Sequence, residues 1–251
     1  MGHLELSTLI FAVIGGALPP LVWLWFWLKE DKHHPEPKSL IVATFIGGML
    51  TVPIALYVER MIALGWPIQT AIATGGMNLF VTFVILVLVE EVVKFIAAQG
   101  IAFPNKNFDE PVDAVIYMIT AALGFASLEN TLFILEGLTN VSLVNNGVFL
   151  NGGVLNELII NNNLRFIGAN VLHTVTSGFV GILLGLAFYK RRIVKIFYIS
   201  GGLATATLLH ALFNFSIITF SDRPVVIFSI FWMMAVFLIL LFEELKTVTK
   251  Y

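Results

Sequence analysis

The sequence predicts an all-helical, polytopic integral membrane protein with about seven transmembrane helices. Hydrophobic residues make up 58% of the 251 residues and charged residues only 12%, and the mean hydropathy is +0.93. Several apolar runs exceed the length of about 18 residues that identifies a membrane helix. Spans of this size fill the chain, so we expect a single transmembrane domain over residues 1–251 and no sizeable soluble module.

The first three spans are apolar runs that end at proline-containing or polar segments. Residues 4–28 are followed by the segment His34-Pro-Glu-Pro, and residues 77–103 end at Phe103-Pro-Asn, with residues 40–64 between them. Proline and polar clusters are typical breaks between helices. The amino-terminal residues lack a basic region and a small-residue cleavage site, so we expect the first span to be retained.

Four more apolar runs follow in the second half of the chain. An asparagine-rich stretch, residues 139–163, and the segment Ser221-Asp-Arg-Pro are expected to be loops between them. The predicted spans are residues 112–137, 164–189, 193–220 and 224–245.

Basic residues fall mainly on one side of this topology. Three arginines lie on the opposite side, at positions 60, 165 and 223. Because cytoplasmic loops carry the excess of Lys and Arg, we expect the N-terminus outside, the C-terminus in the cytoplasm and residues 139–163 outside. The basic residues of the expected cytoplasmic side are Lys29, Lys32, Lys38, Lys106, Lys190, Arg191, Arg192, Lys195, Lys246 and Lys250.

Three charged residues, Glu90, Glu91 and Lys94, interrupt the third span. On insertion scales a charged side chain at the helix centre costs roughly 2.5–3.5 kcal/mol, so these residues are expected to face a partner, a cavity or a reaction. Spacings of three and four place Lys94 on the same helix face as both carboxylates. An ion pair between helices is the structural alternative, but one ammonium leaves one carboxylate uncompensated.

Further polar residues recur in the next three spans. Glu129 lies in the fourth, His173 in the fifth and His210 in the sixth. At 1.5 Å per residue from the outer end of each span, these three side chains lie about 12–15 Å deep and Glu90 about 20 Å deep. They are therefore expected to form one layer in the outer half of the bilayer, where carboxylates and imidazoles are suited to activating water for hydrolysis.

Known signatures of intramembrane proteases narrow the chemistry. The chain has no His-Glu-x-x-His sequence, Ser177-Gly178 is not part of a Gly-x-Ser-Gly sequence, and the spans lack a central pair of aspartates. Without cysteine there is no thiol nucleophile either. Glutamate remains as the water activator.

These same motifs, taken together, resemble the PrsW family of intramembrane proteases over nearly the whole chain. The resemblance implies a glutamic-type intramembrane endopeptidase, related to the CAAX prenyl proteases and to the scaffold subunit of gamma-secretase. The family's best-known role is to cut single-span anti-sigma factors. The motifs are Glu90-Glu-Val-Val-Lys94, Pro111-Val-Asp-Ala-Val-Ile-Tyr117, Gly124-Phe-Ala-Ser-Leu-Glu-Asn130, Arg165 with His173, and His210-Ala-Leu-Phe-Asn214.

The resemblance also implies a role for each matching residue. Which glutamate acts as the base stays open, in part because the prenyl proteases have a histidine at the position of Glu129. The catalytic candidates are Glu90, Glu91, Glu129, His173 and His210. The supporting candidates are Lys94, Phe125, Asn130, Asn214 and Arg165.

Cofactors, partners and competing functions complete the expectations. No cofactor is expected, with Zn²⁺ as the less favoured alternative because the histidines and glutamates lack tight ligand spacing. The expected partners are a single-span membrane protein substrate and the lipid bilayer of the cell membrane, and no nucleic acid. A non-catalytic scaffold and a proton-coupled carrier remain alternatives. A scaffold needs no carboxylate pair, and a carrier commonly shows repeated halves. Substrate identity, cut site and oligomeric state stay open.

Overall fold

The computed structural model describes residues 6–31, 35–144, 152–220 and 222–248, and every regular element within them is a helix. Six helices are long and apolar enough to cross a membrane, and α4, of similar length, carries the three charged residues noted above. The prediction of a polytopic helical membrane protein is confirmed. The helices are α1 (Leu6–Glu30), α2 (Lys38–Gly65), α3 (Ile68–Thr74), α4 (Gly76–Ile101), α5 (Pro111–Val144), α6 (Gly152–Leu186), α7 (Arg192–Thr219) and α8 (Pro224–Leu245).

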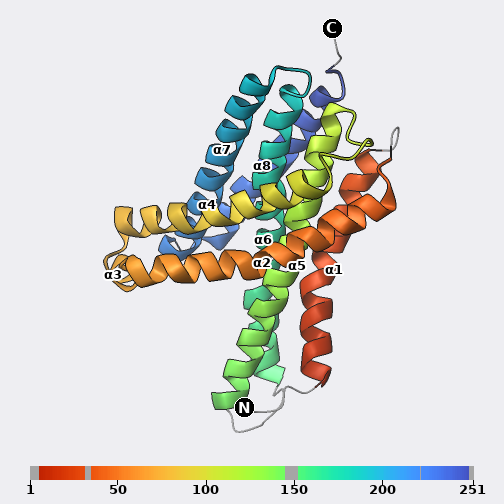
Figure 1. The fold of residues 1–251 in the computed structure, drawn as a ribbon. Coiled ribbons are helices and arrows are strands. Elements are labelled where there is room, and N and C mark those ends of the chain that lie inside the picture. Colours follow the sequence, from red (N-terminus) through yellow and green to blue (C-terminus); the bar gives the residue numbers. More distant parts are fainter. Residues whose placement is uncertain (1–5, 32–34, 145–151, 221, 249–251) are drawn as a thin grey trace.

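Helix α5 is the centre of the bundle. It packs against α1, α2 and α6, and nearly every side chain from Pro111 to Thr131 is buried. Helices α7 and α8 flank α6, whereas α2 and α4 cross the long axis of α5 and α6 steeply (Figure 1). Segments from five helices therefore meet around the middle of α5.

The crossing of α2 and α5 depends on two glycines. A Cβ atom added at Gly48 would lie 2.0 Å from the carbonyl oxygen of Ala121, and one added at Gly124 would lie 2.0 Å from that of Phe45. Any side chain at either position would push the two helices apart, because backbone atoms cannot give way as a side chain does. This close approach sets α2 beside the part of α5 that carries Phe125 and Glu129.

Two of the sequence predictions are wrong in detail. Helix α3, a short helix between α2 and α4, was not predicted. The predicted loop over 139–163 is largely helical, because α5 continues to Val144 and α6 begins at Gly152; only residues 145–151 of it lie outside the described residues. Relative to alanine, asparagine or glycine destabilises a helix by up to about 1 kcal/mol per residue, a cost that does not stop a helix that has already nucleated from continuing.

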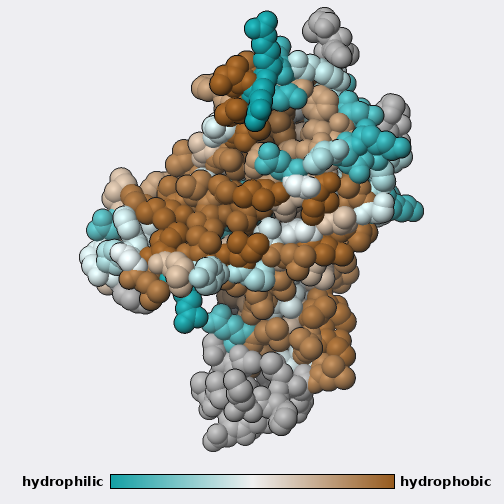
Figure 2. Space-filling model, in the orientation of Figure 1, coloured by the Kyte–Doolittle hydropathy of each residue, from teal (hydrophilic) through white to brown (hydrophobic). Residues whose placement is uncertain are grey.

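The helix ends that carry most basic residues gather at one end of the bundle. The Lys246 ammonium after α8 donates to the carbonyl oxygen of Glu30 at the end of α1, 3.0 Å away. Hydrophilic side chains collect at this end, and an apolar surface covers α2 and α4 (Figure 2). The assignment of this end to the cytoplasmic side is still a prediction from the positive-inside rule.

Cysteine labelling tests that orientation. Because the chain has no cysteine, Asp222→Cys and Arg191→Cys, both at exposed turns, can be labelled without background. We expect a membrane-impermeant thiol reagent to label Asp222→Cys in intact cells and to label Arg191→Cys only after permeabilisation. The reverse pattern would invert the topology.

The segment before α2 is tied to α5 by a buried polar group. The hydroxyl of Tyr117 donates a hydrogen bond to the Glu36 carboxylate. Asp113, also in contact with Glu36, is buried and accepts hydrogen bonds from the backbone N–H groups of Asp109 and Glu110, both at 2.8 Å. Burial raises the pKa of the Glu36 carboxyl above its ordinary value of 4.5.

This raised pKa predicts a pH dependence of stability. Between the unfolded and folded pKa values the folded protein binds more protons, so the contribution of Glu36 is complete below about pH 4.5 and is lost as the pH rises through the folded pKa. Glu36→Gln, which mimics the protonated carboxyl, should raise the thermal midpoint in detergent at pH 8 and flatten its dependence on pH. The exposed Glu244→Gln is the control, and an unchanged pH profile in Glu36→Gln would contradict this prediction.

Candidate active site

The α4 residues Glu90, Glu91 and Lys94 form one buried ionic group. The Lys94 ammonium lies 2.9 Å from Oε1 of Glu91 and 3.4 Å from Oε2 of Glu90. Lys94 and Glu91 are fully buried, and Glu90 is 8% exposed. The predicted helix face is therefore correct, and a single ammonium neutralises one of the two carboxylates.

His173 of α6 links this group to α5. Its Nδ1 lies 2.9 Å from the Lys94 ammonium, and its Nε2 lies 2.9 Å from Oε2 of Glu129. An ammonium can only donate hydrogen bonds, so Nδ1 of His173 accepts one from Lys94. Nε2 therefore carries the ring proton and donates it to Glu129. Both ring nitrogens of His173 are thus engaged.

His210 of α7 is held in the opposite way. Its Nδ1 lies 2.8 Å from Oε1 of Glu91, so Nδ1 carries the proton and donates it to that carboxylate. In the neutral ring this leaves a lone pair on Nε2, which lies 3.9 Å from Oε2 of Glu90. The two imidazole rings stand nearly perpendicular, at 85° with centroids 5.1 Å apart.

The two neighbouring glutamates have different surroundings. Oε1 of Glu91 accepts from Lys94, His210 and the hydroxyl of Thr176, and Oε2 accepts from the hydroxyl of Ser177, both hydroxyls at 3.2 Å. A carboxylate bonded in this way anchors its neighbours. Glu90 has a single long contact to Lys94 and faces the lone pair of His210, so it is the member of the pair with capacity for a water molecule.

The supporting candidates lie around this cluster, as far as the structure describes them. The ring centroid of Phe125 lies 4.5 Å from the Lys94 ammonium and 5.7 Å from the His173 ring. Asn130 donates to Asn170 at 3.5 Å, and Asn214 lines the adjoining cavity. Nothing is described for the side chain of Arg165.

Sequence reasoning missed three contributors. No sequence pattern assigned a role in the cluster to Thr176 or Ser177, because hydroxyl residues are ordinary in membrane helices. Glu59 of α2 interacts electrostatically with Glu129 and Lys94. Its position near the end of the predicted span 40–64 hid it, since a glutamate there reaches water without penalty.

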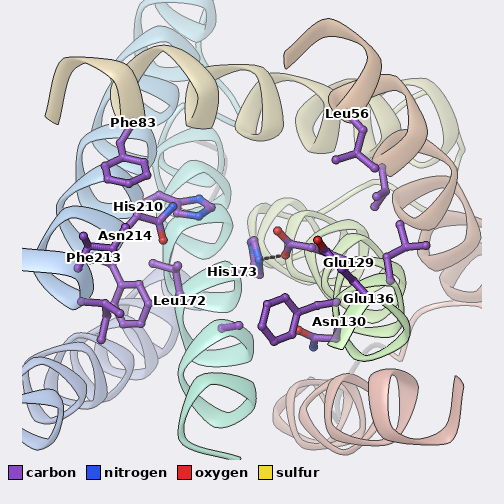
Figure 3. Close-up of a pocket in the computed structure, with 16 residues that line it drawn as sticks. Leu56, Phe83, Glu129, Asn130, Glu136, Leu172, His173, His210, Phe213 and Asn214 are labelled. Carbon is purple, nitrogen blue, oxygen red and sulfur yellow. Dashed lines mark hydrogen bonds and ion pairs between the residues drawn. The ribbon is translucent and has the colours of Figure 1, made fainter. Parts of the chain in front are cut away.

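A cavity of about 400 Å³ adjoins the cluster. Its polar lining residues are Glu129, Asn130, Glu136, His173, His210 and Asn214, which come from α5, α6 and α7 (Figure 3). The other walls are mainly apolar and come from α2, α4, α5, α6 and α7. A concave apolar site with a few convergent polar groups is the usual form of a binding pocket.

The polar residues that were predicted to form one layer lie together in the structure, but Glu90 is nearer to His210 than the residue count predicts. Counting residues along upright spans put Glu90 several ångströms below Glu129 and His210, whereas its carboxylate lies 3.9 Å from His210. The reason is the inclination of α4, which, like α2, crosses α5 and α6 instead of running parallel to them (Figure 1). Residue number along an inclined helix does not measure depth.

Fold and site together define a multi-pass membrane protein with a buried carboxylate and imidazole centre. The chain belongs to the PrsW family, because the family model described as "PrsW family intramembrane metalloprotease" matches residues 36–241.

Several curated proteins named Protease PrsW are similar to this chain. The relative from Bacillus subtilis (strain 168) is 24% identical over 215 residues, 85% of this chain and 86% of the relative. The relative from Geobacillus kaustophilus (strain HTA426) is 30% identical over 128 residues, 50% of this chain and 53% of the relative. The match thus spans about half the length of the Geobacillus relative. The relative from Clostridioides difficile (strain 630) is 28% identical over 142 residues, 56% of this chain and 56% of the relative. No solved structure matches the chain significantly.

The family description implies a metal, and Glu90, His173 and His210 are the residues to test. Their donor atoms lie within 4.8 Å of one another, close enough for one ion. However, a metal-bound histidine needs a free lone pair, and His173 uses its Nδ1 lone pair for the Lys94 ammonium and its Nε2 proton for Glu129. The ammonium is itself a cation among these donors. The arrangement therefore fits Lys94 and does not fit a divalent cation.

Proposed function

We propose that this protein is an intramembrane endopeptidase of the glutamic type, in which Glu90 activates a water molecule. The observation that carries the proposal is the pair formed by the Glu90 carboxylate and the free lone pair of His210, 3.9 Å apart, of which His210 also lines the cavity. A water molecule between two acceptors at this separation can donate one hydrogen to each. Its oxygen lone pairs then point towards a peptide carbonyl in the cavity.

The steps of hydrolysis follow from these positions. The water oxygen bonds to the carbonyl carbon as Glu90 takes one proton, which gives a tetrahedral intermediate with a negative oxygen. The amide of Asn214, one helical turn from His210, is a donor for that oxygen. The carbon–nitrogen bond then breaks, and the leaving nitrogen takes the proton from Glu90.

The remaining charged residues hold this geometry. Glu91 orients both Lys94 and His210, and Lys94 with Glu129 orients His173. The positive charge of the ammonium favours the charged form of Glu90, the form that a base requires. Glu129, which borders the cavity beside His173, is the second carboxylate available for proton transfer.

The substrate proposed is a membrane protein with a single span, in the cell membrane. The site lies among membrane-spanning helices, and the cavity walls are largely apolar. By resemblance to the family, an anti-sigma-factor-like regulator is the proposed substrate class. A non-catalytic scaffold would not require a carboxylate base, an oriented imidazole and a cavity close to one another. A proton-coupled carrier would be expected to transport without cleaving peptides.

Cleavage by the purified protein in lipid nanodiscs tests the proposal. We expect a single-span reporter peptide to be cut within or next to its apolar segment, and we expect EDTA or 1,10-phenanthroline to change the rate less than twofold. Mass spectrometry of the fragments locates the cut. Loss of activity with chelator that added Zn²⁺ restores would favour the metal mechanism instead, and intact peptide throughout would contradict the proposed function.

A further inference from the structure

The cavity extends from the catalytic cluster in one direction only. On α5 its lining residue Leu132 follows Glu129, on α6 Ala169 precedes His173, and on α7 Ile218 follows Asn214. Because α5 and α6 run in opposite directions, both displacements point towards the end where α5 finishes and α6 begins (Figure 1). A substrate segment in the cavity therefore lies on this side of the reacting bond.

The lining changes from buried to exposed along the cavity. Near the cluster, Leu172 is 2% and Phe213 is 6% exposed, whereas at the rim Leu56 is 50%, Leu132 is 38% and Ile218 is 56% exposed. The rim residues come from α2, α5 and α7, on the outer surface of a bundle that spans a membrane. The exposed Glu136, one helical turn after Leu132 on α5, also lines the cavity, so a segment that enters across the rim meets mainly apolar side chains and one acidic residue.

Ala169 is the small residue at the inner part of this cavity. It lies one helical turn before His173 on the same face of α6, is partly buried, and shares the lining with Leu172 and Phe213. A larger side chain at this position would project into the space beside the imidazole. The volume of about 400 Å³ is within the range of ligand pockets and exceeds what the catalytic water alone requires.

We infer that the cavity is a specificity pocket for a large apolar substrate side chain next to the scissile bond, and that Ala169 sets its size limit. The inference rests on the proposed function and names the substrate feature that the site selects. A Leu or Phe side chain makes apolar contacts in the space between α6 and α7, whereas Asp or Gly does not gain these contacts. Apolar pockets of this kind discriminate by about 10–200-fold.

The experiment uses the full chain in nanodiscs and synthetic single-span peptides. The cut site is first located by mass spectrometry. The substrate residue next to the cut, on the side that lies in the cavity, is then varied as Gly, Ala, Leu, Phe or Asp. We expect wild-type kcat/KM to be at least tenfold higher for Leu and Phe than for Gly and Asp. Ala169→Phe should remove that preference, with a loss of at least tenfold for Leu and Phe peptides and less than threefold for the Ala peptide.

Two further variants guard against damage to folding. Ala204→Phe, on the exposed face of α7, is the matched control and should leave the ranking of peptides unchanged. Ile217→Ala enlarges the opposite wall of the cavity and should increase cleavage of a Trp peptide relative to the Leu peptide. The inference would be overturned if Ala169→Phe lost activity equally for all peptides and Ile217→Ala left their ranking unchanged. Cleavage by the wild type would still support the proposed function in that case. A wild type that cuts no peptide would overturn both.

Discussion

Glu90→Gln is expected to abolish peptide cleavage, with a loss of about 10³-fold or more in kcat/KM, while the protein stays folded. The change preserves the size of the side chain and removes its basic oxygen, and general bases typically contribute 10²–10⁴-fold. Among the described residues Glu90 has one hydrogen bond, to Lys94 at 3.4 Å, so we expect little loss of stability when its charge is removed. Cleavage of the reporter peptide and the thermal midpoint, measured on the same preparation, separate these effects.

Glu91→Gln gives the informative comparison. Its side chain holds Lys94, His210, Thr176 and Ser177, so we expect it to lower the thermal midpoint as well as the activity. The exposed Glu244→Gln should change neither. Full activity in Glu90→Gln would refute the assignment of the base, and full activity in both neighbouring variants would refute a glutamic mechanism.

Lys94→Met is expected to destabilise the protein by about 3–5 kcal/mol, the usual effect of removing one partner from a buried ion pair. Lys94 is fully buried and is the only ammonium within 4 Å of Glu90 or Glu91 among the described residues. Without it, two carboxylates lie uncompensated among apolar helices, and His173 loses the donor that fixes its tautomer. Thermal or SDS-induced unfolding of the purified variant measures the loss.

A double substitution separates charge from packing in this prediction. Lys94→Met combined with Glu91→Gln removes both charges, so it should recover part of the stability but none of the activity. The coupling free energy from the four proteins then measures the ion pair directly. A Lys94→Met protein as stable as the wild type would show that the ammonium is not needed to neutralise the cluster.

Much of the fold and the site was predictable, because both follow from patterns along single helices. Apolar runs located the long helices, and the spacings of three and four put Glu90, Glu91 and Lys94 on one face. The relations between helices were not predictable in the same way. The inclination of α4, the helical continuation of α5 and α6, and the contact of Glu36 with Tyr117 depend on packing partners distant in sequence. The unequal surroundings of Glu90 and Glu91 depend on Thr176 and Ser177, which no local pattern distinguishes.

The long sequence separation within the cluster has a consequence for synthesis of the protein. Lys94 meets His173, 79 residues later, and Glu91 meets His210, 119 residues later. At about 5–20 residues per second, α4 leaves the ribosome between about 4 and 24 s before these partners exist. During that interval its three charges are unfavourable in lipid. We therefore expect α4 to integrate fully only when α6 and α7 arrive, a step that would complete assembly of the proposed catalytic centre.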